Sequence, residues 1–126
     1  MAERRMLSQK ITESDAFLDL PLASQALYLH ICMSADDDGF IANAKTICRM
    51  IGATQDDLNA LIEARFLLTF EDGVMCVKHW RINNQIRKDR HQVTAYREYA
   101  ERLGIKANGA YTMDKEQAQL AWSPLV

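Results

Sequence analysis

The basic residues that follow position 77 are the part of this sequence best suited to binding a ligand. Within thirteen positions the chain carries Lys78, Arg81, Asn84, Arg87, Lys88 and Arg90. Cationic side chains bind phosphate groups and release counterions from nucleic acids, and an amide such as that of Asn84 contacts phosphate oxygens or base edges. The run therefore predicts a DNA-binding segment. The alternative is an ordinary solvated charged surface.

The net charge of the whole chain, −2 at pH 7, hides this run. Residues 13–72 hold eleven Asp and Glu against three Lys and Arg, whereas residues 78–102 hold seven Lys and Arg against three Asp and Glu. The distribution of charge bears more directly on nucleic-acid binding than the sum does. The sequence thus contains one acidic and one basic region.

A second charged run, Asp36-Asp37-Asp38-Gly39, has the residue types of a site for a hard cation. It lacks the spaced ligands and the terminal Glu of a calcium loop, and adjacent side chains in a turn seldom converge on one ion. A turn that leads into a short strand at Phe40 is the favoured interpretation, and we expect neither a metal nor a cofactor.

No pattern of residues indicates catalysis. Cys32, Cys48 and Cys76 are widely spaced and form no metal-ligand motif, and no local arrangement pairs a nucleophile with a base. Unpaired thiols suit a reducing compartment, and no apolar stretch approaches the length of a transmembrane helix. We therefore expect a cytoplasmic protein that is not an enzyme and has no membrane partner.

The elements that position these residues begin with a helix between Pro21 and Asp36. This stretch contains no internal proline or glycine, and its apolar residues lie nearly all round the helix. Such a helix is typically central and buried. Ser14 is placed to cap a short helix before it.

Two further helices and a hairpin follow. A helix that begins at Asn43 and ends at Gly52 precedes a second one, for which Thr54 and Asp57 predict a capping box. Two helices joined by a short turn form a helix-turn-helix. Residues 66–70 and 74–79 are rich in strand formers and flank an Asp-Gly turn, which predicts a β-hairpin. The order predicts a winged helix-turn-helix: mainly α with a small β-hairpin, in the α+β class.

The pattern weakens after Trp80, which we expect to close the core under the hairpin rather than to stack on a base. The predicted organisation is a basic N-terminal arm over 1–12, a winged-helix domain over 13–80, a basic segment and C-terminal helix over 81–104, and a flexible tail over 105–126. Arg4, Arg5 and Lys10 make the arm a second basic candidate, or else a mobile solvated terminus.

The second helix of a helix-turn-helix usually enters the major groove. Here its polar side chains are mostly acidic or uncharged, and DNA would repel the acidic ones: Gln55, Asp56, Asp57, Asn59 and Glu63. Lys45 and Arg49 on the preceding helix are alternative contacts. Groove insertion and a purely structural role for the second helix both remain open.

Four segments resemble the N-terminal winged-helix domain of Gram-positive phage replication proteins, the replisome-organiser and DnaD-like group. They are AERRMLSQKITESDAFLDLPLASQALYLH, ADDDGFI, RMIGATQDDL and KHWRINNQIRKDR, and they span about residues 2–97. The resemblance implies a DNA-binding or assembly module that acts at a replication origin in a bacterial host cell, with a helicase or helicase loader as a partner. Such proteins usually carry a further C-terminal domain, and YTMDKEQAQLAWSPLV resembles none.

Two hypotheses follow for function. The favoured one is a DNA-binding replication protein that uses the hairpin and residues 78–97; the other is a protein-protein assembly module without direct DNA contact. Acidic screening of Arg87, Lys88 and Arg90 in the folded protein would favour the second. An acidic body and a basic C-terminal region also make a homo-oligomer possible.

Overall fold

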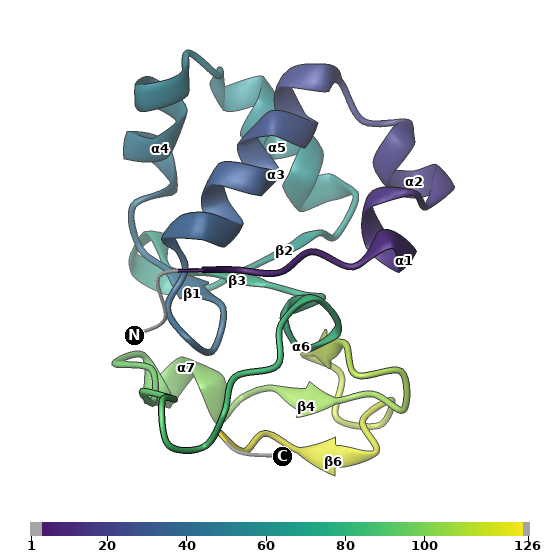
Figure 1. Ribbon diagram of the computed structural model, residues 1–126, viewed down its shortest axis with the longest axis vertical. Coiled ribbons are helices and arrows are strands. Elements are labelled where there is room, and N and C mark those ends of the chain that lie inside the picture. Colours follow the sequence, from purple (N-terminus) through teal and green to yellow (C-terminus); the bar gives the residue numbers. More distant parts are fainter. Residues whose placement is uncertain (1–3, 125–126) are drawn as a thin grey trace.

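The computed structural model describes residues 4–124 and has an α+β fold. Within that range, seven helices accompany two small three-stranded antiparallel sheets. Helices α1–α5 occupy the upper half of Figure 1, the first sheet lies beneath them, and the second sheet lies in the lower half. The longest described helix has 13 residues, and none is long and apolar enough to cross a membrane.

Two one-turn helices, α1 (Gln9–Thr12) and α2 (Asp15–Leu18), precede the central helix α3 (Leu22–Ser34). Ser14 caps α2 as expected, because its side chain accepts a hydrogen bond from the Phe17 amide. One side of α3 buries Leu27, Tyr28 and Ile31.

The expectation that α3 is buried on nearly all sides is wrong for its opposite face. There the side chains of Leu22, Leu29 and Met33 are 80%, 40% and 55% exposed. The apolar face of α3 is therefore wider than the face that the core buries.

Helices α4 (Ala44–Ile51) and α5 (Gln55–Glu63) follow, joined by a three-residue turn and packed against α3. Gly52 ends α4 in the left-handed conformation, with φ of 79°. Thr54 and Asp57 form the expected capping box, in which each side chain accepts a hydrogen bond from the other's backbone amide. The two sequence signals for this turn are both confirmed.

The first sheet combines β1 (Phe40–Ile41), β2 (Leu67–Thr69) and β3 (Met75–Val77) in the order β1-β3-β2. The expected hairpin forms between β2 and β3, with Leu68 opposite Cys76. A short 3-10 turn, η1 (Glu71–Gly73), connects the strands, and both Asp72 and Gly73 have positive φ. In Figure 1 the sheet lies beneath α3, α4 and α5, and α5 packs directly against β2.

The chain beyond the hairpin folds into α6 (Trp80–Asn83), α7 (Arg97–Ala100) and a sheet of β4 (Gly104–Ile105), β5 (Tyr111–Thr112) and β6 (Leu120–Ala121). The strand order is β5-β4-β6. Residues 105–124 therefore form strands and core contacts, where the sequence pattern predicts a poorly packed tail. Tyr111 and Trp122 belong to the buried core, and their burial offsets the cost of ordering this short-stranded segment.

Candidate nucleic-acid interface

The acidic run at Asp36 is a buried turn that organises the region around it. Asp36 Oδ1 accepts hydrogen bonds from the amides of Asp38 and Phe40, at 2.9 and 3.0 Å, so the expected turn into a strand is confirmed. Gly39 has φ of +91°, and a Cβ atom there would lie 2.7 Å from Cγ of Trp80. The turn needs glycine both for its backbone conformation and for the approach of the indole.

Asp37 fixes the N-terminal segment. Its Oδ1 lies 2.9 Å from Nη1 of Arg5 in an ion pair with both side chains buried, and its Oδ2 accepts the Gln92 amide at 3.0 Å. Burial alone would raise the pKa of Asp37, but the Gln92 amide and the Arg5 guanidinium together lower it. Arg5 also lies over the Trp80 ring, 5.1 Å from its centroid. Arg5 is thus internal rather than part of a solvated basic arm.

Asp38 holds the segment that follows the basic run. Its Oδ1 lies 2.7 Å from Nε2 of His91, and its Oδ2 accepts the Thr94 amide at 2.8 Å. Its backbone oxygen accepts the Tyr111 hydroxyl at 2.9 Å. Burial raises the pKa of Asp38, against the lowering effect of the Thr94 amide and His91.

The beginning of the same segment is fixed by two neighbouring amides. Asn83 Oδ1 accepts the Ser8 amide and its Nδ2 donates to the Tyr28 hydroxyl, while Asn84 Oδ1 accepts the Met6 amide at 2.8 Å. Residues 85–90, which we call the basic loop, are therefore anchored on both sides by hydrogen bonds to buried side chains. An anchored loop presents its side chains with little further loss of backbone entropy on binding.

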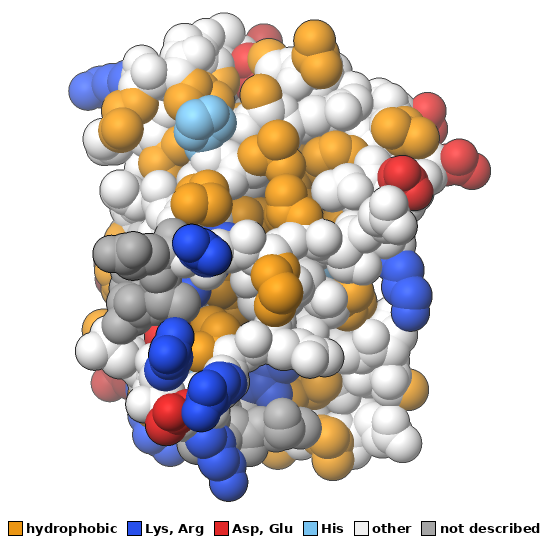
Figure 2. All heavy atoms as spheres, in the orientation of Figure 1, with side chains coloured by type: hydrophobic (Ala, Val, Ile, Leu, Met, Phe, Trp, Pro, Cys, Tyr) orange, Lys and Arg blue, Asp and Glu red, His pale blue; other side chains and the backbone are white. Residues whose placement is uncertain are grey.

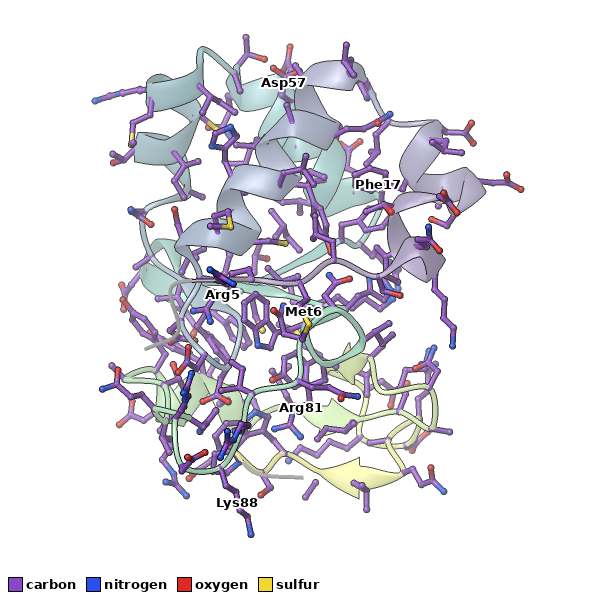
Figure 3. All side chains as sticks on the ribbon, in the orientation of Figure 1. Arg5, Met6, Phe17, Asp57, Arg81 and Lys88 are labelled. Atoms are coloured by element: carbon purple, nitrogen blue, oxygen red, sulfur yellow. The ribbon has the colours of Figure 1, made fainter. Side chains whose placement is uncertain are left out.

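The basic loop carries three exposed cationic side chains. Arg87, 74% exposed, pairs with Asp89 at 3.2 Å. Lys88 and Arg90 are exposed, and no ion pair within residues 4–124 involves either. Figure 2 shows Lys and Arg side chains gathered over the lower half of this face, and Figure 3 shows Lys88 extending away from the body. Acidic screening thus reaches one of the three cations.

Arg81 and Asn84, expected to contact DNA beside these cations, have internal partners instead. Arg81 donates from Nε to the Tyr111 hydroxyl at 3.3 Å and from Nη2 to the backbone oxygen of Ser123. Its guanidinium lies 5.5 Å from the Tyr111 ring centroid. Asn84 is buried, and its side-chain oxygen accepts the Met6 amide. Through these bonds, Asn84 holds Met6 and Arg81 holds Ser123 against α6.

Lys78 is half-buried and belongs to a different group of cations. Burial lowers its pKa, and so do the nearby charges of Lys106 and Arg65. The pKa of His79 is also lowered, to about 4, by burial and by the charges of Lys78 and Lys106. No sequence pattern indicates Arg65 and Lys106 as neighbours of Lys78, because each is an isolated cation distant from it in sequence.

Lys45 and Arg49 lie on the exposed face of α4, in the upper half of the molecule. The basic loop belongs to the lower half, so the structure does not bring these two residues together with Lys88 and Arg90. Neighbouring α5 exposes Gln55, Asp56, Asn59 and Glu63. The surface formed by α4 and α5 is therefore mixed in charge.

The tip of the hairpin is acidic and exposed, and the segment around α7 contacts it. Arg102 donates from Nη1 to both carboxylate oxygens of Glu71, at 2.9 and 2.8 Å, and the Tyr99 hydroxyl lies 3.2 Å from Oδ2 of Asp72. Phe70 and Tyr99 pack with ring centroids 5.2 Å apart. The segment around α7 thus rests on the hairpin tip, a contact between distant residues that no local sequence pattern signals.

Groups suited to metal binding or covalent chemistry are scarce. In the described part of the chain, no three His, Cys, Asp or Glu side chains are arranged to hold a metal ion. Cys32, Cys48 and Cys76 are buried free thiols, and burial raises the pKa of Cys32 to about 12. A thiol of that pKa is almost fully protonated at neutral pH and is a poor nucleophile.

Comparisons with protein-family models, with curated proteins and with solved structures gave no match to this chain. The arrangement of its own residues is therefore the basis for assigning a function.

Proposed function

We propose that this chain is a winged helix-turn-helix protein that binds DNA through the phosphate backbone, as a phage replication protein of the replisome-organiser type. The order α3, β1, α4, α5, β2, β3 and the sheet order β1-β3-β2 support this interpretation. In it, α5 takes the place of the recognition helix and the β2–β3 hairpin that of the wing. The proposal places the protein in the cytoplasm of a bacterial host and assigns it no catalytic step.

The observation that carries the proposal is the pair of free cations on the basic loop. Lys88 and Arg90 are exposed, unpaired within the described chain, and fixed by a loop anchored to the Asp37–Asp38 turn. Each cation that contacts a phosphate releases condensed counterions, which supplies sequence-independent affinity. A preorganised pair of cations loses less entropy on binding than a mobile pair would.

The charges elsewhere argue for backbone contact rather than reading of the major groove. Asp56 and Glu63 are exposed on α5, and Glu71 and Asp72 occupy the hairpin tip. These carboxylates would be repelled by phosphates on both sides of a groove. The proposed contact surface is therefore the basic loop, and not the helix and wing that such folds usually place on DNA.

Fluorescence anisotropy with labelled duplex and single-stranded DNA over a salt series tests this function. Lys88→Ala/Arg90→Ala should weaken duplex binding and reduce the slope of log K against log salt by about 1.8, because two phosphate contacts are lost. The matched control, Lys45→Ala/Arg49→Ala, removes the same charge from exposed α4 and should leave the slope nearly unchanged. Equal losses in the two variants, or no binding by the folded protein at low salt, would refute the proposal.

The second candidate function is a protein-protein assembly module that joins replication proteins such as a helicase or its loader. The exposed apolar stripe of Leu22, Leu29 and Met33 on α3 favours it, because exposed apolar patches mark interaction surfaces. Light scattering over a concentration series first tests whether the stripe joins two copies of this chain. Self-association through the stripe would be supported if the mass of the wild type rises with concentration while that of Leu22→Ser/Met33→Ser stays monomeric. A wild-type mass that stays monomeric at all concentrations would exclude it.

A further inference from the structure

A cavity of about 520 Å³ lies between the Asp37–Asp38 turn, α6, the basic loop and β4. Its volume is in the range of pockets that hold small molecules. Its polar lining includes Arg81, Asn84, Lys88 and His91, and its apolar lining includes Ile86 and Ile105. Figure 3 places Arg81 beside this part of the molecule, below the N-terminal segment that contains Arg5 and Met6.

Two residues of the lining carry hydrogen-bond donors that have no partner. Arg81 Nη1 and Asn84 Nδ2 are both buried, and neither has an acceptor in the described structure. Asn84 is only 7% exposed, and its oxygen is committed to the Met6 amide. Because buried donors in native proteins are nearly always satisfied by protein or by ordered water, these two are available to donate to an acceptor in the cavity.

The charge of the lining favours an anion. Asp37 and Asp38 also line the cavity, but Arg5 and the Gln92 amide bind the first carboxylate, and His91 and the Thr94 amide bind the second. Within residues 4–124, Arg81 has no acidic side-chain partner and Lys88 has no ion pair. With Asp37 paired to Arg5, the lining keeps two cations, Arg81 and Lys88, against the single carboxylate of Asp38.

The remaining lining includes apolar residues. Ile86 and Ile105 line the cavity together with Trp80, whose indole nitrogen already donates to the backbone oxygen of Asp37. The cavity thus combines hydrogen-bond donors for an anion with apolar side chains. This combination matches a compound that carries a phosphate and a ring.

We propose that this cavity binds a nucleotide, with the phosphate on Arg81, Asn84 and Lys88 and the base against Ile86 and Ile105. Two ligands carry this combination of phosphate, sugar and base: a free nucleotide and the 5′-phosphorylated end of a DNA strand. The site does not depend on duplex binding by the basic loop, since binding of a free nucleotide requires only the cavity.

The test is a calorimetric titration of the full chain with deoxyadenosine 5′-monophosphate, deoxyadenosine and inorganic phosphate. The nucleotide should bind at least tenfold more tightly than either fragment, because each fragment uses half of the lining. An oligonucleotide with and without a 5′-phosphate identifies the source: a gain in affinity with the phosphate assigns the strand end, and binding of the free nucleotide alone assigns the small molecule.

The decisive variant is Asn84→Asp. Aspartate keeps an oxygen for the Met6 amide, removes the unpartnered donor and adds a negative charge to the cavity, so nucleotide binding should fall at least tenfold. Lys88→Ala, at an exposed position, should weaken binding about threefold without affecting the fold. Asn59→Asp on exposed α5 makes the same charge change as Asn84→Asp and serves as its control.

Two outcomes would overturn the proposal: no nucleotide binding by the folded protein at millimolar concentration, or binding that neither Asn84→Asp nor Lys88→Ala weakens. Nucleotide binding and salt-dependent duplex binding, both measured on the unmodified chain, separate the two proposals. Duplex binding without nucleotide binding rejects the cavity site alone. Nucleotide binding without duplex binding rejects the DNA-binding function alone.

Discussion

The two charged runs of this chain, Asp36–Asp38 and the basic loop of residues 85–90, differ in burial and in how far other residues compensate their charges. In the first run, Asp37 and Asp38 are buried, and their carboxylates bind distant parts of the chain, among them Arg5, His91 and Thr94. The basic loop leaves Lys88 and Arg90 exposed and unpaired within the described residues. A run of charges is thus a candidate binding site only where the fold leaves its charges uncompensated.

The comparison also explains why the two runs depend on each other. The acidic turn accepts the amides of Gln92 and Thr94, which follow the basic loop directly. Loss of these contacts would free the loop and increase the entropy lost when it binds a ligand. The buried acidic run therefore preorganises the exposed basic one.

The largest effect is expected from Asp37→Ala, which leaves the Arg5 guanidinium buried without its partner. Removal of one partner from a buried ion pair costs about 3–5 kcal/mol. We expect a loss of this size in the free energy of unfolding, measured by urea denaturation. A loss below about 1 kcal/mol would show that the acidic turn is no more important to stability than an exposed charged surface.

Gly39→Ala should have the next largest effect. The substitution forces a Cβ into a backbone with φ of +91° and to within 2.7 Å of the Trp80 ring. The conformational cost and the steric conflict together should destabilise the protein by about 3 kcal/mol. Gly73→Ala is the matched control, because its φ of +74° is also positive but a Cβ there meets no atom within 4 Å. Equal losses at both positions would mean that the close approach of Trp80 has no energetic importance.

The pH dependence of stability should differ between the wild type and Asp37→Asn. Because the folded protein lowers the pKa of Asp37, the ionised carboxylate contributes stability that is complete above the unfolded value of about 4 and is lost as the pH falls through the folded value. Urea denaturation of both proteins between pH 7 and pH 3 should show a difference in unfolding free energy that is constant near neutrality and shrinks below pH 4. A difference independent of pH would contradict the ion pair with Arg5.

Much of the upper half of the fold was predictable because its signals are local. Gly52, the Thr54–Asp57 capping box and the Asp72-Gly73 turn each determine a few residues of backbone, and each predicted feature is present. Trp80 closes the core as expected, at 2% exposure. Local backbone chemistry of this kind requires no knowledge of the rest of the chain.

The site was less predictable because its geometry depends on long-range contacts. Nothing near Arg81 in the sequence indicates Tyr111 and Ser123 as its partners, and nothing near Asp37 indicates Arg5. Strands β4 and β6, two residues each, are too short to show an alternating pattern. Sequence reasoning therefore identified the basic loop but could not separate its free cations from its internal ones.

The smallest effect, and the sharpest test of the comparison, is expected from Asp89→Ala. Asp89 pairs with Arg87 at the surface, where both side chains are more than half exposed, so its removal should change the unfolding free energy by less than about 1 kcal/mol. The same change frees a third cation on the basic loop. DNA affinity should therefore rise, and the slope of log K against log salt should become steeper by about 0.9. Glu63→Ala on α5 removes the same charge far from the loop in sequence and should leave the slope unchanged; a similar rise in both variants would assign the gain to net charge alone.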